Sequence, residues 1–272
     1  MSSTLLEVLD AVERRYRWQS LVVDGHEWRW LDTATAGPVA ILLPGSLGDA
    51  GMFAVTLSSL GEQARLIAVT YPAVSEPGAL ADGLAALMDH LAIEAAAVVG
   101  SSFAAWWSQY FALKYPRRVA ALVIGNGFVE GKDLADNPLF DREQVSSISA
   151  QTLHGQWLER VRASPVTPLQ QLQHHMLADR QSPASLMSRL LGVINALPCP
   201  PLTLPQRALT VLDCDDDPLI PLPVRERFRM QYPQARHVTL PSGGHYPHLL
   251  NSAAYEALLL EVLTRSTKGD SK

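Results

Sequence analysis

The stretch AAAVVGSSFAAWW, residues 95–107, decides how this sequence is expected to fold. Residues 95–100 form a short apolar run typical of a buried strand, and the residues from 103 onward predict a helix that ends before Pro116. A strand that leads directly into a helix is the repeating unit of a parallel α/β sheet. Two adjacent serines, Ser101 and Ser102, occupy the turn between the two elements.

The turn GSSFA, residues 100–104, follows the pattern G-x-S-x-G of a nucleophile elbow, with Ala104 in place of the second glycine. Small residues in such a turn let strand and helix approach closely, while the central residue is held strained and exposed. This frame makes Ser102 the predicted nucleophile and leaves Ser101 for packing or a local hydrogen bond. The alternative is structural, because serine is also favoured as the N-cap of a helix.

Apolar runs rich in β-branched residues continue on both sides of the elbow and alternate with stretches of helical spacing. This pattern predicts an α/β fold with a largely parallel sheet and crossover helices. Residues 20–32 predict a hairpin that turns at Asp24-Gly25. Further strands are expected at residues 39–45, 65–72, 95–100, 119–126, 207–221 and 235–245, and a closing amphipathic helix at residues 252–265.

The strand pattern is interrupted between Gly127 and about Pro198, where amphipathic and polar segments contain no β-rich run. We interpret this region as an inserted, mostly helical cap, and residues 198–205 as a stiff return linker. The expected organisation is a first core part at residues 1–126, a cap at residues 127–204 and a second core part at residues 205–272. The tail 266–272 is expected to be disordered.

Composition limits the classes of partner. The 272 residues are 47% hydrophobic and 18% charged with a net charge of −5, which suits a sizeable core and provides no basic face for nucleic acid or a membrane surface.

The N-terminus lacks a signal-peptide core and no apolar run is long enough to span a bilayer, so we expect a cytoplasmic protein. Cys199 and Cys214 form no metal-binding pattern, so we expect no disulfide, no metal and no cofactor.

A serine nucleophile needs a base, and the base needs an orienting acid; in elbow enzymes the acid and then the histidine follow the serine along the chain. His245 is the predicted base, because Gly243 and Gly244 place it on a turn just past a strand. His248 would begin the next helix as a surface or packing residue.

Four carboxylates compete for the orienting role in the segment DCDDDPLIP. Asp217 is our choice, because it is the last turn position before an apolar step and a proline, and Asp216 is the main rival. At least two of the four must cap or be solvated, since clustered buried carboxylates raise one another's pKa. The remaining candidates are Asp213 and Asp215.

An oxyanion hole requires two backbone N–H groups, one from the residue after the nucleophile and one from the loop after the third strand. Phe103 is predicted to supply the first, and Ser46 the second, with Leu47 as the alternative. Glycines in this loop would let it turn close to a substrate. The same segment is also compatible with an ordinary tight turn or a poor phosphate loop.

The motifs GSSFA, DDPLIP and GGHYPHL, in this order and on these elements, resemble those of the α/β-hydrolase superfamily with a helical cap, and the resemblance covers about residues 20–265. One departure is Pro44-Gly45, where many members of the superfamily have His-Gly. Residues 66–103 and 232–252 look similar to the maspardin branch, which is associated with protein binding.

The resemblance and the serine imply hydrolysis of a carboxylic ester, with thioester or C–C bond cleavage by the same triad as alternatives. A non-catalytic binding module is the competing hypothesis. The expected partner is a partly apolar small molecule, and nothing in the sequence indicates an oligomeric state. Apolar residues of the cap would line a pocket or pack in the core: Leu153, Trp157, Leu158, Met176, Leu177, Met187 and Leu190. Arginines of the cap would meet an anionic substrate or be solvated: Arg160, Arg162, Arg180 and Arg189.

Overall fold

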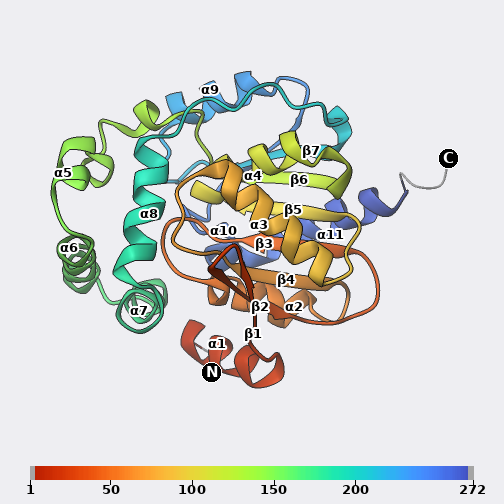
Figure 1. The fold of residues 1–272 in the computed structure, drawn as a ribbon, viewed down its shortest axis with the longest axis horizontal. Helices are drawn as coiled ribbons and strands as arrows, with labels where there is room; N and C mark the ends of the chain where they lie inside the picture. Colours follow the sequence, from red (N-terminus) through yellow and green to blue (C-terminus); the bar gives the residue numbers. More distant parts are fainter. Residues whose placement is uncertain (1–3, 269–272) are drawn as a thin grey trace.

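A single eight-stranded sheet organises residues 4–268, which are the residues that the computed structural model describes (Figure 1). The strands are β1 (Gln19–Val23), β2 (His26–Asp32), β3 (Val39–Leu43), β4 (Arg65–Thr70), β5 (Ala96–Ser101), β6 (Val119–Gly125), β7 (Leu209–Cys214) and β8 (Arg236–Leu240). Their order across the sheet is β1-β2-β4-β3-β5-β6-β7-β8. The pairs β1–β2 and β2–β4 are antiparallel and all pairs from β4 to β8 are parallel, which confirms the predicted fold class.

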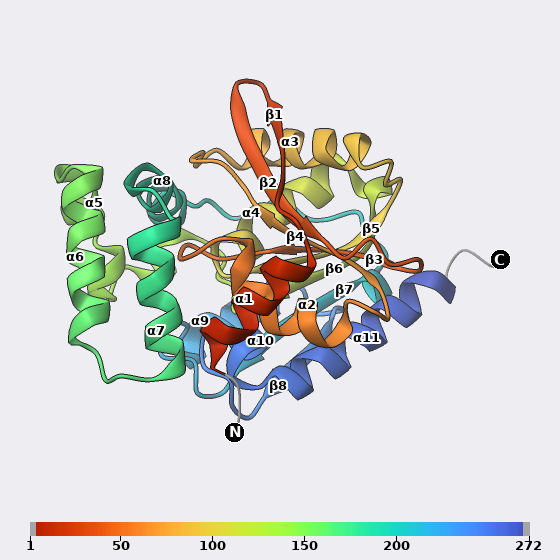
Figure 2. The ribbon, with the colours of Figure 1, turned by 90° about the horizontal axis from the view of Figure 1, so that it is seen from below.

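The central strands are apolar throughout because helices cover both faces of the sheet. The core helices are α1 (Leu5–Arg15), α2 (Ala54–Leu60), α3 (Pro77–His90), α4 (Phe103–Lys114), α9 (Leu222–Gln231), α10 (Pro247–Leu250) and α11 (Ser252–Lys268). Figure 2 shows α3 and α4 on one face and α2 and α11 on the other. Helix α11 includes residues 266–268 of the tail that we expected to be disordered, and residues 269–272 lie outside the described part.

The hairpin between β1 and β2 turns where the sequence predicted it. Asp24 and Gly25 have φ angles of 49° and 79°, as a two-residue type I′ turn requires. Helix α1, in contrast, was not predicted. Its signal is a capping box, in which the Thr4 side chain accepts from the backbone of Glu7 and the Glu7 side chain accepts from the backbone of Thr4.

The cap is a helical insertion between β6 and β7, as predicted. It contains α5 (Arg142–Ser147), α6 (Ala150–Ala163), α7 (Pro168–His175), a π-helix, η5 (Met176–Arg180), and α8 (Pro183–Ile194). Both ribbon views show α8 nearer to the sheet than α5 and α6 (Figures 1 and 2). The domain limits at residues 127 and 204 stay a prediction. Short 3-10 helices complete the chain: η1 (Ala50–Phe53), η2 (Pro116–Arg118), η3 (Gly131–Leu134), η4 (Pro138–Phe140) and η6 (Gln206–Ala208).

Candidate active site

Ser102 lies at a sharp turn between β5 and α4. Its φ of 54° and ψ of −116° are unusual for a residue other than glycine, and its side chain lines a cavity. A Cβ atom at Gly100 would lie 2.4 Å from the carbonyl oxygen of Ala104, so the close approach of strand and helix requires glycine there. Ser101 also contributes to the cavity wall, but it is the last paired residue of β5. The strained backbone therefore distinguishes Ser102 from Ser101.

The loop after β3 comes into direct contact with this turn. A Cβ atom at Gly45 would lie 2.9 Å from the Cβ of Ser102 and 3.6 Å from its Oγ. Ser46 and Leu47 follow and line the same cavity. Phe103 is the first residue of α4, so its N–H has no acceptor within the helix. The candidate oxyanion donors therefore belong to the two segments that meet at Ser102.

Asp217 and His245 are in contact although they follow different strands. The Nδ1 atom of His245 lies 2.9 Å from Oδ2 and 3.1 Å from Oδ1 of Asp217. The side chain of Asn126 donates to Oδ2 at 2.7 Å, and the backbone N–H groups of Leu219 and Ile220 donate to Oδ1 at 2.8 and 3.2 Å. Burial alone would raise the pKa of Asp217, but the pKa is lowered because His245, Asn126 and Leu219 stabilise the carboxylate.

Asp216 has a different role from its neighbour. Its carboxylate accepts from the backbone N–H of Gly243 at 3.2 Å and of Gly244 at 2.7 Å, so it holds the turn that carries His245. Asn126 supports the same turn through a 3.2 Å bond to the carbonyl oxygen of Gly244. Of the two rivals for the orienting role, only Asp217 contacts the histidine.

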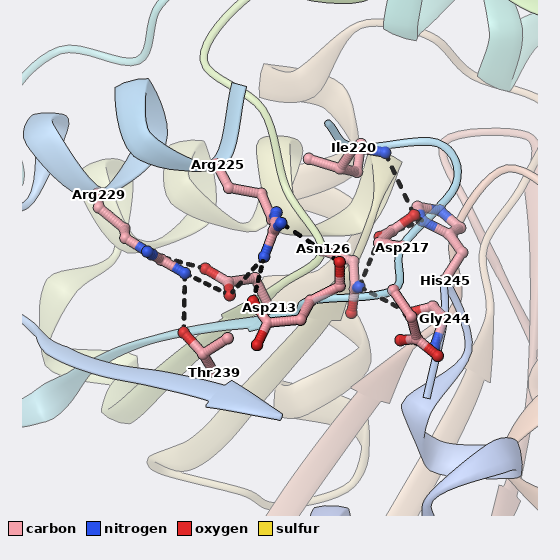
Figure 3. A network of polar contacts seen from close by, with 11 residues as sticks. Asn126, Asp213, Asp217, Ile220, Arg225, Arg229, Thr239, Gly244 and His245 are labelled. Carbon is pink, nitrogen blue, oxygen red and sulfur yellow. Dashed lines mark hydrogen bonds and ion pairs between the residues drawn. The ribbon is translucent and has the colours of Figure 1, made fainter. Parts of the chain in front are cut away.

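The other two carboxylates of the cluster pair with arginines of α9, and they differ in burial: Asp213 is buried, whereas Asp215 is exposed, as expected for a solvated member of the cluster. Asp213 accepts from Arg229 at 2.6 and 2.8 Å and lies 3.6 Å from Arg225, which also contacts Asp215 at 3.0 Å. Figure 3 shows Asp213 directed toward the two arginines and Asp217 toward His245 and Asn126. Ion pairs with α9 therefore neutralise the like charges that the sequence placed side by side.

A cavity of about 450 Å³ lies between the elbow and the cap, and both Ser102 and His245 line it. Its apolar wall includes residues of the cap and of the loops that follow the strands: Leu47, Met52, Leu139, Phe140, Trp157, Val161, Leu169, Leu219, Tyr246 and Leu250. Among the cap residues expected to line a pocket, Trp157 does so. Four others are buried in the core instead: Leu153, Met176, Leu177 and Leu190.

The cap arginines occupy different environments. Arg160 is exposed and lines the cavity, whereas Arg162 pairs with Glu159. Arg180 pairs with Glu13 and with Asp49. Arg189 is completely buried, contrary to the expectation that these side chains would be solvated or would meet a substrate.

His248 was expected to be a surface or a packing residue, and the structure shows that it is a packing residue. It is 3% exposed, its ring lies 4.8 Å from that of Phe53, and it lines the cavity. Burial, with a smaller effect of His245, lowers the pKa of His248 to about 3. His248 is therefore neutral at physiological pH.

Sequence reasoning did not identify Asn126, Tyr71 or Gln181 at the site, and it expected Arg189 to be solvated or to meet a substrate, not to bind the loop after β3. Asn126 has a φ of 50° at the end of β6, a conformation that asparagine adopts more readily than most residues. The other three contact the loop after β3 from far along the chain, and no local sequence signal marks them. Within residues 4–268, no group of His, Cys, Asp or Glu is arranged to hold a metal ion, and no helix is both long and apolar enough to cross a membrane.

The family model described as "Alpha/beta hydrolase family" matches residues 40–258. Maspardin of Mus musculus is 26% identical over 251 residues, which cover 86% of this chain and 79% of that protein. An esterase from Thermogutta terrifontis superposes with a TM-score of 0.72 at 21% identity, covering 91% of this chain and 99% of the other. An esterase from Exiguobacterium antarcticum gives a TM-score of 0.71 at 17% identity, covering 89% and 97%.

Proposed function

The chain belongs to the alpha/beta hydrolase family, and on that premise we propose that it is a serine hydrolase that cleaves a small-molecule carboxylic ester. Ser102 is the nucleophile, His245 the general base and Asp217 the orienting acid. The observation that supports this most is the pair of contacts between His245 Nδ1 and Asp217, on a histidine that lines the same cavity as Ser102.

The proposed reaction proceeds through an acyl-enzyme. With Nδ1 bound to the carboxylate of Asp217, Nε2 is the nitrogen that takes the proton of Ser102 as its Oγ attacks the ester carbonyl. The backbone N–H groups of Phe103 and of Ser46, or Leu47, stabilise the oxyanion. His245 then protonates the leaving alcohol, and a water activated by His245 hydrolyses the acyl-enzyme.

The cavity supports a partly apolar small molecule as the substrate. Apolar side chains from the cap and the core form most of its wall, and Ser102 and His245 also line it. The same three residues would also serve a thioesterase or a C–C bond hydrolase, so the leaving group separates these alternatives.

A non-catalytic binding module is the second candidate, and the similarity to maspardin supports it. A module of this kind would need the cavity or the outer surface but not a base in contact with an acid. The contact between His245 and Asp217 favours the enzyme.

Labelling with a fluorophosphonate, followed by peptide mapping, tests the nucleophile. We expect the label on Ser102 and none on Ser101. In parallel, the wild-type protein should hydrolyse a short or medium-chain p-nitrophenyl ester, and His245→Asn should lose this activity while keeping its circular dichroism spectrum. Acyl thioesters and vinylogous diketones are the comparison substrates. A wild-type protein that is inert to all three classes and resists the label would favour the binding module.

A further inference from the structure

We propose that Arg189, with Gln181, is a positioning residue that orients the backbone N–H groups of the loop after β3 for oxyanion binding. Both side chains belong to the cap, whereas the loop belongs to the core. This inference rests on the proposed serine hydrolase function. It makes the cap a structural part of the oxyanion hole as well as a cover for the substrate.

Arg189 holds the loop from inside the protein. It lies on α8 and is 0% exposed. One terminal nitrogen, Nη1, donates to the carbonyl oxygens of Gly48 at 2.7 Å and Gly45 at 3.1 Å, and Nη2 lies 3.4 Å from the carbonyl oxygen of Tyr71. The guanidinium carbon lies 4.1 Å from the centre of the Tyr71 ring, in cation–π geometry. The side chain thus connects the cap to two segments of the core.

A buried arginine of this kind is costly to the fold. Within residues 4–268, no carboxylate forms an ion pair with Arg189, and its Nε atom has no hydrogen-bond partner. A buried charge with no carboxylate at ion-pair distance is unfavourable, and an apolar side chain would fill the space between α8 and the core at lower cost. Packing alone therefore does not account for a guanidinium at this position.

The carbonyl contacts fix the direction of the neighbouring N–H groups. In a trans peptide the C=O of one residue and the N–H of the next point in opposite directions. Arg189 and the hydroxyl of Tyr71, at 3.0 Å, hold the C=O of Gly45, which sets the N–H of Ser46. Gln181 donates to the C=O of Ser46 at 2.7 Å, which sets the N–H of Leu47. Both candidates for the second oxyanion donor are thus oriented by cap side chains.

Those two N–H groups remain available to a substrate. In the described part of the chain, the N–H groups of Ser46 and Leu47 have no acceptor, whereas the next N–H in the loop, that of Gly48, donates to Gln181 at 2.9 Å. Preorganised donors that need no rearrangement during the reaction are the basis of oxyanion stabilisation.

A second cap contact strengthens the same connection. Arg180, the residue before Gln181, binds Asp49 at 3.1 Å, and Asp49 in turn accepts from the N–H of Gly51 at 2.7 Å. The carbonyl of Gln181 is held by His154 of α6 at 3.1 Å. The loop after β3 is therefore attached to the cap at several points between residues 45 and 49.

The test compares Arg189→Met with the wild-type protein on a p-nitrophenyl ester. We expect kcat to fall by about 10²-fold, the scale of losing one oxyanion donor, while KM changes little because the oxyanion forms only in the transition state. The affinity for a trifluoromethyl ketone, which forms an oxyanion on Ser102, should fall by the same factor. Arg189→Lys should recover part of kcat, because its ammonium can replace the donors of Nη1 but not the contact of Nη2 with the Tyr71 carbonyl or the planar guanidinium over the Tyr71 ring.

The control is Arg65→Met, which removes a partly buried arginine at the start of β4, where it pairs with Asp32 at 2.8 Å. We expect it to lower the melting temperature and to leave kcat unchanged. Gln181→Leu provides an independent test if Arg189→Met does not fold, with the same selective fall in kcat.

The proposal is overturned if folded Arg189→Met keeps the wild-type kcat, or if its activity falls only in proportion to unfolded protein as in Arg65→Met. A fall in kcat and ketone affinity at unchanged KM supports it. Failure of the proposed function has a different signature, since the wild-type protein and its variants would then be equally inert and unlabelled by the fluorophosphonate; that result would remove this inference as well.

Discussion

The loops that carry the acid and the histidine are held by the core itself, whereas the loop that carries the candidates for the second oxyanion donor is held largely by the cap. On the first side, Asp216 and Asn126 bind the turn before His245, and all of these residues follow strands of the sheet. On the second side, Gln181 and Arg189 bind the loop after β3 across the boundary between cap and core.

This difference separates two kinds of catalytic requirement. The residues proposed to transfer protons should keep their geometry as long as the sheet is intact, because their supports follow adjacent strands. Of the two proposed oxyanion donors, the N–H of Phe103 is positioned by the core at the start of α4, whereas the donor in the loop after β3 should keep its geometry only while α8 and the segment after η5 remain in place. Variants on the first side should therefore impair proton transfer, and variants on the second should impair stabilisation of the oxyanion.

Asp217→Asn should have the largest effect, because it disrupts the acid and histidine loops that the core holds. We expect turnover to fall by about 10⁴-fold, because an amide holds the histidine in the wrong tautomer. Steady-state hydrolysis of a p-nitrophenyl ester measures the effect. Asp213→Asn and Asp215→Asn are the controls, since their carboxylates face arginines of α9, and both should be far milder. A severe Asp216→Asn beside a mild Asp217→Asn would contradict the assignment.

Gly45→Ala should disrupt the loop after β3, which carries the candidates for the second oxyanion donor. The new Cβ atom would lie 2.9 Å from the Cβ of Ser102, so the loop must move away from the nucleophile. We expect kcat to fall by about 10²-fold, as when one oxyanion donor is lost. Gly155→Ala is the matched control, because a Cβ atom there meets nothing within 4 Å on the exposed side of α6. It should keep full activity, and equal activity of the two variants would refute the close approach.

The features that could be predicted from the sequence are those that depend on residues close together in the chain. The hairpin at Asp24-Gly25 and the elbow at Ser102 depend on residues adjacent in the chain, and both elements lie where they were predicted. The strands and the helical insertion follow from apolar periodicity, which is also local. The capping box of α1, formed by Thr4 and Glu7, is a local signal of the same kind.

The supports of the site could not be predicted in this way. Arg189 meets Gly45 across 144 positions, and Asn126 meets Asp217 across 91. Periodicity shows that α8 has a buried side, but it does not show that a charged residue is on that side or which carbonyl it will meet. The sequence favoured Asp217 over its rival Asp216 by position alone, and the contact of Asp217 with His245 is what the tertiary structure adds.

His248 joins the two sides, since it follows the histidine loop and packs against Phe53, which follows the loop after β3. Its pKa of about 3 in the folded protein lies below the ordinary value of about 6.5, so its contribution to stability is complete above pH 6.5 and is lost as the pH falls toward 3. Between pH 7 and pH 5 we expect the free energy of unfolding to fall by about 2 kcal/mol more in the wild-type protein than in His248→Phe.

Urea denaturation at a series of pH values measures this difference. His26→Gln is the control, because His26 is exposed in the β1–β2 hairpin, and this variant should keep the wild-type slope. If the free energy of unfolding falls equally with pH in the wild-type protein and in His248→Phe, His248 does not contribute to the loss of stability in acid.

The smallest expected effect concerns the part of the cap that faces the substrate rather than the loop. Arg160 lines the cavity and forms no ion pair within residues 4–268, whereas Arg162, two positions along the same helix, pairs with Glu159 at 2.8 Å. An ester with a carboxylate at the far end of its acyl chain would therefore meet a single cation. We expect Arg160→Gln to raise KM for this ester by roughly two- to fivefold, the scale of an exposed ion pair, and to leave the neutral ester of equal length unchanged. Arg162→Gln should change neither KM value, and the effect of Arg160→Gln should weaken at high salt. An equal rise in KM for both esters would mean that Arg160 shapes the cavity wall but does not bind the carboxylate of the substrate.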